Sequence, residues 1–451
     1  MLPSHPLRET LHNEVHARPY ERLTAPLLLS HVAMFGPPAG AAYAHMVELL
    51  RKRHLPLPAV DANHLSADLG GVHLRWEKHT EFHTCTFWKP LAETNPALAS
   101  AERAVDRVFD RAVDRAFDQT AIAELPPEWL AALPGEWLVG LHMLVLDAPG
   151  LRQSGPAMSS ALRRLVSANL YEDSLVGASL MDGDAQVCTD FRLRADGFSR
   201  TVLATDAMNP RRLGRAVQRL LEIETYRMAA LMGLPLAREV GASLVHAEQD
   251  LATVAAQIRS ARREQEPELL RQLTQLAAEV ESLYARTHAR FSASAAYFEL
   301  LQRRITELCE QRIETLQSLG DFMDRRLAPA MQTCAWAARR QQALSERISR
   351  ISNLLRTRVE IEQQQSSQDL LDAMNRRQKA QMLLQTAVEG LSVAAVTYYG
   401  AGLVGYVAKG LKAAGVNLAP DVAVAFSIPL IALAVWFGIR RLHRSAQAAA
   451  D

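Results

Sequence analysis

Two long apolar runs near the C-terminal end dominate the hydrophobic pattern of the chain. No charged residue occurs from Gly390 to Ala408 or from Val422 to Ile439. About 18 apolar residues suffice for a helix to cross a hydrocarbon layer of roughly 30 Å. Two lysines and several turn-forming residues separate the runs. We therefore predict a transmembrane hairpin over residues 388–439, with spans at about 390–408 and 422–439 and a tail at 440–451.

Upstream, residues 1–235 mix short apolar runs that are typical of strands with amphipathic stretches that are typical of helices. Three Gly-containing dipeptides mark tight turns between strands. The pattern predicts an α+β domain with strands at 27–34, 64–69, within 72–88, 136–147, 175–181, 185–194 and 198–205, and helices at 39–53, 95–118, 155–166 and 209–232. Both halves have the order strand, helix, three strands, helix. An internal duplication and ordinary α+β alternation explain this order equally well.

Residues 239–385 have a helical pattern throughout, with almost no glycine. Pro267 and Pro329 can each occupy the first turn of a helix, so they divide the stretch into three long helices. Apolar residues recur at steps of three and four, as in Phe298, Leu301 and Ile305. This spacing predicts a coiled-coil or bundled stalk that runs into the first span. We expect the protein to form a homo-oligomer through the stalk and the spans.

Charge and cysteine content narrow the class of partner. The chain of 451 residues has 50 Lys and Arg against 49 Asp and Glu, a net charge of +1. No overall positive field for nucleic acid exists, so we expect no nucleic-acid partner. The four cysteines are far apart and form neither a disulfide framework nor a zinc motif. No motif for a cofactor is visible, and we assign no cofactor.

The flanking charges predict the topology of the hairpin. We expect no cleaved signal peptide, because no basic segment followed by an apolar one opens the sequence. Six basic residues flank the outer ends of the hairpin, whereas two lie in its loop. Basic residues concentrate on the cytoplasmic side of membrane proteins. We therefore expect a bacterial inner-membrane protein with both termini in the cytoplasm and the lipid bilayer as one partner.

The densest polar group lies within residues 72–88. Alternating positions carry the polar side chains of His73, Arg75, Glu77, His79, Glu81 and His83. On one unbroken strand these side chains would share a face, and imidazoles with carboxylates could hold a divalent metal. A turn near Thr80 would separate them, and a polar outer face of an amphipathic strand explains the same pattern. His79 and Glu81 would take part in such a site, but we assign no metal.

Further charged residues form the second set of candidates. They are Asp190, Arg192 and Asp196 in the second half of the domain and Glu222, Glu224 and Arg227 on its last helix. A structural network of ion pairs and a ligand pocket both account for them. No sequence motif of a P-loop, a Rossmann fold, a serine hydrolase or a zinc protease occurs. The catalytic residues, if any exist, are therefore unknown.

Small and aromatic residues in the first span favour close helix packing. Tyr398 and Tyr399 lie near its middle, where a tyrosine hydroxyl needs a partner. Gly402 and Gly405 are small enough to let a second helix approach. We expect these four residues to pack against the second span or a neighbouring subunit. A polar permeation path is the alternative.

Five stretches resemble one family of bacterial membrane-anchored proteins, known as domain of unknown function 3422. They are LHNEVHARPY (Leu11 to Tyr20), RWEKHTEF (Arg75 to Phe82), TDFRLRADGFSR (Thr189 to Arg200), LLEIETYRMAALMGLP (Leu220 to Pro235) and VEGLSVAAVTYYGAGLVGY (Val388 to Tyr406). The resemblance implies a C-terminally anchored protein and brings no reaction or ligand with it. It also makes Asn13, Glu14, His16 and Arg18 candidates for ligand binding, since their motif has no core-forming pattern.

Three functional hypotheses remain. The first is a non-enzymatic anchored scaffold or sensor that binds an unknown protein or small molecule. The second is an oligomeric ion channel or transporter, because the layout is similar to that of CorA-type magnesium channels. Their Gly-Met-Asn signature is missing, and Gly415-Val416-Asn417 only partly resembles it. The third is a metal-dependent enzyme that uses His79 and Glu81. Absence of catalytic motifs favours the first.

Overall fold

The computed structural model describes residues 4–9, 11–12, 20–60, 62–91, 117–148, 150–154, 157–158, 160–313, 315–414 and 419–447. The chain forms two compact units. The first comprises Met1–Gln257 and Arg271–Arg350, and the second comprises Ile258–Leu270 and Ile351–Asp451. Nearly all of the helix predicted at 95–118 lies outside the described residues.

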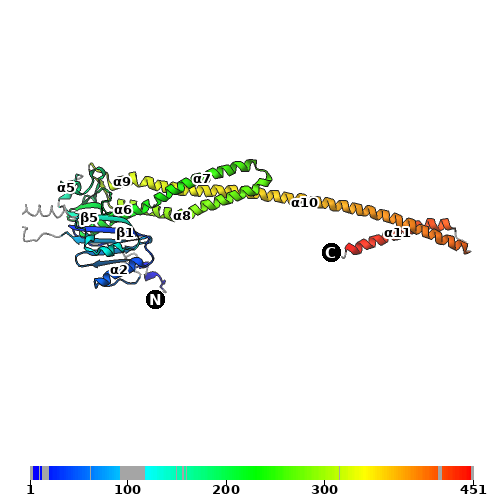
Figure 1. Cartoon of the computed structure of the whole chain (residues 1–451), viewed down its shortest axis with the longest axis horizontal. Coiled ribbons are helices and arrows are strands. Elements are labelled where there is room, and N and C mark those ends of the chain that lie inside the picture. The colour runs from blue at the N-terminus through cyan, green and yellow to red at the C-terminus, as the bar shows by residue number, and fades with distance from the viewer. Residues whose placement is uncertain are drawn as a thin grey trace, which may run out of the picture. The chain divides into compact units, whose positions relative to one another are not determined.

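A nine-stranded sheet organises the first unit (Figure 1). Its order is β2-β3-β4-β1-β5-β8-β7-β6-β9. Neighbours are antiparallel except β5 and β8, which are parallel. The strands are β1 (Leu27–Phe35), β2 (His64–Asp68), β3 (His73–Lys78), β4 (Phe82–Pro90), β5 (Glu136–Asp147), β6 (Val176–Leu180), β7 (Ala185–Thr189), β8 (Ser199–Thr205) and β9 (Gln311–Arg312). The prediction of an α+β domain followed by long helices is confirmed.

Helices cover both faces of the sheet. Side chains alternate along each strand, so each strand contributes residues to the cores on both sides. Even-numbered β1 residues such as Leu28 and Val32 pack under α2 (Ala41–Lys52), α4 (Pro127–Ala131) and α5 (Ser160–Asn169). Odd-numbered residues such as Leu29 and Ala33 join the core beneath α6 (Pro210–Leu231) and the helices that follow. Short 3-10 helices complete this part: η2 (Ala121–Glu124), η3 (Leu151–Ser154) and η4 (Glu172–Ser174).

Among the described residues, each half of the sheet domain has one strand, one α-helix and then three strands, but the strands pair in different directions. In the first half, β4 pairs with β1 antiparallel. In the second half, β8 pairs with β5 parallel. A duplicated unit would keep the direction of corresponding strands. Ordinary α+β alternation therefore explains the repeated order better than an internal duplication does.

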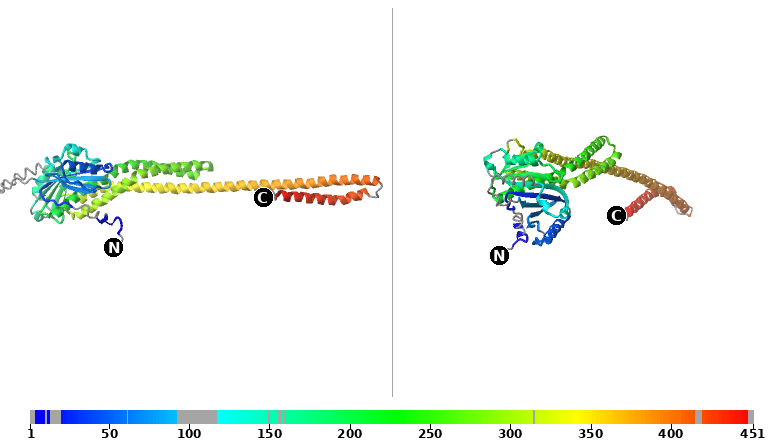
Figure 2. Two further views of the ribbon diagram at one scale, coloured as in Figure 1. Left: turned by 90° about the horizontal axis from the view of Figure 1, so that it is seen from below. Right: turned by 60° about the vertical axis from the view of Figure 1, so that its left-hand side comes forward.

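The first unit also contains most of three long helices that lie side by side (Figures 1 and 2). They are α7 (Gly233–Ser260), α8 (Glu266–Glu307) and the first part of α10 (Ala328–Ala413). Arg340 of α10 pairs with Glu248 of α7, and Thr287 of α8 donates to Gln341 at 3.1 Å. The predicted breaks are present, since η5 (Arg263–Gln265) precedes Pro267 and α10 begins beside Pro329. Between α8 and α9 (Leu319–Arg326) the chain returns to the sheet as β9, which the pattern did not indicate.

In the second unit, the end of α10 and α11 (Pro420–Gln447) form an antiparallel hairpin (Figure 2). A methyl group on Gly405 would lie 3.1 Å from Val424, and one on Gly400 would lie 3.2 Å from Ile431. Among the described residues, Gly402 has no neighbour within 4 Å of that position. Tyr398 and Tyr399 are 77% and 72% exposed, so they do not pack against α11. Close approach of the two helices thus depends on Gly400 and Gly405.

Three helical segments among the described residues are long and apolar enough to cross a membrane, by length and composition. They are Pro210–Ser260, Leu319–Ala413 and Pro420–Arg441. The first corresponds to α6 and α7, which contribute many residues to the core beneath the sheet. Its apolar character is therefore explained by packing inside the first unit. The other two contain the predicted spans.

Candidate functional site

A cavity of about 400 Å³ opens between one face of the sheet and helices α6 and α8. Strands β1, β3 and β4 form its floor, and the segment Tyr20–Leu23 forms part of its wall. Volumes of this size are typical of small-molecule sites. The polar or ionisable residues that line it are Tyr20, Glu21, His31, Arg75, Glu77, His79, Thr84, Thr86, Gln218, Glu222, Thr225, Tyr226 and Arg304.

Strand alternation explains why this face is polar. On β3, Leu74 and Trp76 enter the opposite core, so Arg75 and Glu77 face the cavity. On β4, Cys85 and Phe87 are likewise in the opposite core, whereas Thr84 and Thr86 line the cavity. The same pleat that buries one set of apolar side chains thus presents charged and hydroxyl groups to α6.

The wall segment is fixed directly to α6. The backbone amide of Leu23 donates to the carbonyl oxygen of Pro210 at 3.1 Å. Glu21 lies so close to Gly214 that a methyl group there would overlap its backbone oxygen. Only glycine permits this approach, because it lacks a Cβ. Any larger residue at position 214 would therefore displace Glu21 from the cavity wall.

Two groups of ion pairs flank the cavity. Arg75 is only 7% exposed, and it donates to Glu77 at 2.8 Å and lies 3.5 Å from Glu21. Arg304 of α8 pairs with Glu222 of α6 and, at 3.0 Å, with Glu307. Burial strengthens such pairs because little water screens them. Each guanidinium group is thus held by two carboxylates.

A buried histidine on β1 forms part of the floor. His31 on β1 contacts the hydroxyl of Thr86 through Nδ1 at 2.8 Å and that of Thr225 through Nε2 at 3.0 Å. Burial lowers the pKa of His31 to about 4, against a smaller opposing effect of Glu77. The imidazole is therefore neutral at pH 7.

The shifted pKa makes stability depend on pH. The folded protein releases the His31 proton near pH 4, whereas an unfolded chain does so near 6.5, so the unfolded state binds more protons between these values. We expect the protein to lose about 3 kcal/mol from this residue as the pH falls from 7 to 4. The His31→Gln variant should lose less than wild type over this range in urea unfolding. Exposed His246 provides the control, since His246→Gln should leave the pH dependence unchanged.

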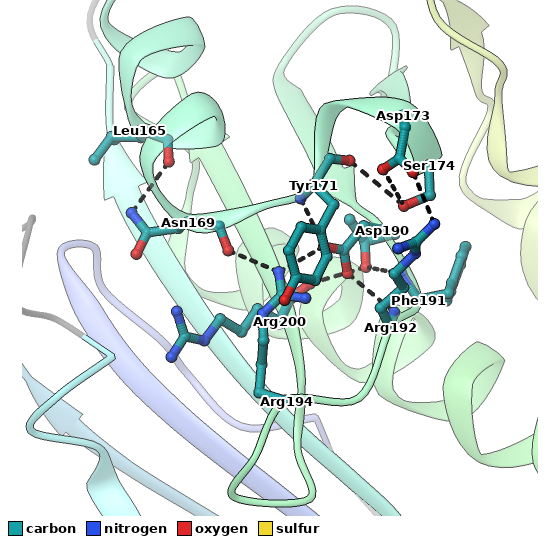
Figure 3. Close-up of polar contacts among 11 residues, drawn as sticks. Leu165, Asn169, Tyr171, Asp173, Ser174, Asp190, Phe191, Arg192, Arg194 and Arg200 are labelled. Carbon is teal, nitrogen blue, oxygen red and sulfur yellow. Dashed lines mark hydrogen bonds and ion pairs between the residues drawn. The ribbon is translucent and has the colours of Figure 1, made fainter.

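Two of the predicted residues, Asp190 and Arg192, belong to a separate polar cluster (Figure 3). Asp190 is buried and accepts hydrogen bonds from the backbone amides of Tyr171 and Arg192, at 2.9 and 3.0 Å. Arg194 donates to it at 2.6 Å and stacks on the ring of Tyr171. Asp196 accepts from the amide of Phe198. These contacts hold the loop after β7 in place.

The remaining sheet and α6 candidates also have partners of their own. Glu224 is buried and pairs with Arg227 at 2.7 Å. Glu81 contacts Arg290 and Tyr297 of α8 at 2.9 and 3.0 Å, while His79 stacks on Phe82 and reaches the cavity. Among the described residues, no group of three or more His, Cys, Asp or Glu side chains is placed to hold a metal ion. Asn13, Glu14, His16 and Arg18 lie outside the described residues.

Of the predicted site residues, the structure brings four together at the cavity: Arg75, Glu77, His79 and Glu222. Sequence reasoning missed His31, Thr86, Thr225 and Arg304, although all line the same cavity. One signal existed, since Ser30 and His31 interrupt the apolar run of β1. A polar pair inside a strand buried along its whole length needs partners, and that need could have drawn attention to His31.

The comparisons with known proteins identify a family without assigning an activity. No curated protein and no solved structure matches the chain. A family model described as "Protein of unknown function (DUF3422)" matches residues 3–446, which is nearly the whole sequence. The stretches around Arg75, Asp190 and Glu222 that first suggested the resemblance all lie inside this match. The chain therefore belongs to the DUF3422 family of proteins of unknown function.

Proposed function

We propose that the protein is a non-enzymatic, membrane-anchored sensor or scaffold whose sheet domain binds a small molecule in the cavity beneath α6. The observation that carries the proposal is the cavity itself, which combines the buried Arg75 and other polar side chains with an apolar wall. Polar groups that leave water lose their hydration, which lowers the stability of the fold. Their retention in this cavity therefore favours a role in binding a ligand. The absence of catalytic motifs from the sequence favours binding over turnover.

The end of α10 and helix α11 would supply the anchor. Both contain apolar segments of sufficient length, and their large side chains are exposed, as lipid-facing residues would be. At the end of α11, Arg440 stacks on Trp436 at 4.4 Å. Tryptophan and arginine are common at the boundary between lipid and water. Basic residues beyond both outer ends support cytoplasmic termini in a bacterial inner membrane.

Self-association through the stalk is part of the same proposal. Leu370, Met374 and Leu384 on α10 are each more than half exposed. Leu384, Val388 and Leu391 recur at steps of four and three, the spacing of a coiled-coil seam. A second copy of the chain could cover them. The number of copies decides whether the hairpins merely anchor the protein or surround a common axis.

The test is native mass spectrometry of the full-length protein in detergent, incubated with a library of small metabolites. We expect one ligand per subunit, a discrete oligomer and no change in the mass of the released ligand. Gln218→Trp should abolish binding, because Gln218 lines the cavity and tryptophan would fill it. Gln249→Trp on the exposed side of α7 is the matched control. Equal binding by both variants, or conversion of the ligand, would refute the proposal.

A further inference from the structure

The hydrogen bonds around His31 have a direction that can be assigned. The hydroxyl of Thr225 donates to the carbonyl oxygen of Leu221 at 2.9 Å, so it accepts from Nε2 of His31. A neutral imidazole with a proton on Nε2 has an acceptor at Nδ1. Thr86 therefore donates its hydroxyl proton to Nδ1. Both threonine hydroxyl groups thus donate their hydrogen bonds to other groups of the protein. The oxygen of Thr86 can still accept a hydrogen bond from a ligand in the cavity.

The arginines around the cavity are similarly engaged. Arg75 is held by Glu77 and Glu21, and Arg304 by Glu222 and Glu307. Three carboxylates and two guanidinium groups line the cavity. Carboxylates therefore outnumber guanidinium groups in the lining by one, so an anionic ligand would add to an excess of negative charge that a cation would offset. The electrostatics of the lining therefore disfavour an anion and favour a cation.

The rest of the lining suits an apolar body that carries a positive charge. Phe82, Trp88 and Tyr226 contribute aromatic rings to the wall, and Leu29 and Val217 contribute aliphatic groups. Aromatic faces attract cations by roughly 0.5–2 kcal/mol when water is excluded. Hydrogen-bond acceptors and aromatic rings thus occur together in one small cavity.

We propose that the cavity binds a small organic cation, whose ammonium or guanidinium group donates hydrogen bonds to Thr86 and the carboxylates while its apolar part packs on the aromatic wall. This inference rests on the proposed function, because it names the chemical class of the ligand for the same cavity. Glu21 is the carboxylate best suited to a test. Its side chain is 30% exposed, so replacing it by glutamine keeps the shape of the wall.

Three probes of similar shape separate charge from size: 2-phenylethylamine, 2-phenylethanol and 3-phenylpropionate. Isothermal titration calorimetry of the full-length protein in detergent at pH 7.5 measures each Kd. We expect the amine to bind at least about tenfold more tightly than the alcohol, a difference of about 1.4 kcal/mol, and the carboxylate to bind most weakly. Glu21→Gln should weaken amine binding about tenfold and leave the alcohol unchanged. Glu48→Gln, at a surface pair on α2, is the control.

The outcomes distinguish this inference from the function on which it rests. Tightest binding of 3-phenylpropionate, or amine binding that Glu21→Gln leaves unchanged, would overturn the assignment of a cation and leave the cavity as a binding site. If no probe binds while the metabolite library yields an anion displaced by Gln218→Trp, the inference is also wrong and the proposed function stands. If neither the probes nor the library yield a ligand, both are wrong.

Discussion

Replacing Gly214 by alanine should destabilise the first unit by about 4 kcal/mol, near the upper limit for a single added methyl group. The new Cβ would overlap the backbone oxygen of Glu21, and a backbone atom cannot rotate away as a flexible side chain can. The segment Tyr20–Leu23 would have to leave α6, which would break the bond from Leu23 to Pro210 and expose Leu23. Urea unfolding followed by tryptophan fluorescence measures the loss.

A second helix glycine provides the matched control for this experiment. A methyl group on Gly241 of α7 would have no neighbour within 4 Å among the described residues, so alanine fits there. Gly241→Ala should stabilise the protein by about 0.5–1 kcal/mol, because alanine favours helix more than glycine does. Ligand binding should be lost only in Gly214→Ala, since the wall of the cavity moves. Equal effects of the two substitutions would show that the contact with Glu21 is unimportant.

Replacing the buried Arg75 at the cavity should cause the second large loss of stability. Arg75→Met keeps the length and apolar stem of the side chain but leaves Glu77 and Glu21 without its guanidinium group. Breaking a buried ion pair by removing one partner costs roughly 3–5 kcal/mol, so we expect a loss of about 4 kcal/mol at pH 8.

An exposed arginine tests whether burial causes this effect. Arg192 pairs with Asp173 at 2.9 Å, but these side chains are 49% and 69% exposed. Arg192→Met should therefore change the free energy of unfolding by less than about 1 kcal/mol. A loss for Arg75→Met no larger than that for Arg192→Met would mean that the pair at the cavity is hydrated.

Local sequence patterns were sufficient to predict most strands of the sheet. The strands at 27–35, 136–147 and 199–205 follow stretches rich in apolar and β-branched residues, and turn dipeptides separate the later strands. The charged row of residues 73–83 divides where the sequence suggested a turn, because β3 ends at Lys78 and β4 begins at Phe82. In each case the signal lies within a few neighbouring residues.

The cavity depends on contacts that no local pattern contains. Arg75 and Glu222 line the same cavity because α6, which lies far from β3 in the sequence, packs on that face of the sheet. Arg304 reaches Glu222 only because α8 packs back beside α6. Charge and alternation identified Arg75, Glu77 and His79 as one group of candidates and Glu222 as part of a separate group. Their common location required the tertiary packing of elements whose order in space the sequence does not state.

Strand β9 has a consequence for synthesis of the protein on the ribosome. It pairs with β6 through Ala178 and Ser179, and it is translated only after α6, α7 and α8. At about 5–20 residues per second, β6 therefore waits on the order of ten seconds for its neighbour. During this time its outer edge can pair with other nascent chains. A gene truncated after α6 would keep that edge open permanently, so the sheet should aggregate unless residues through β9 are included.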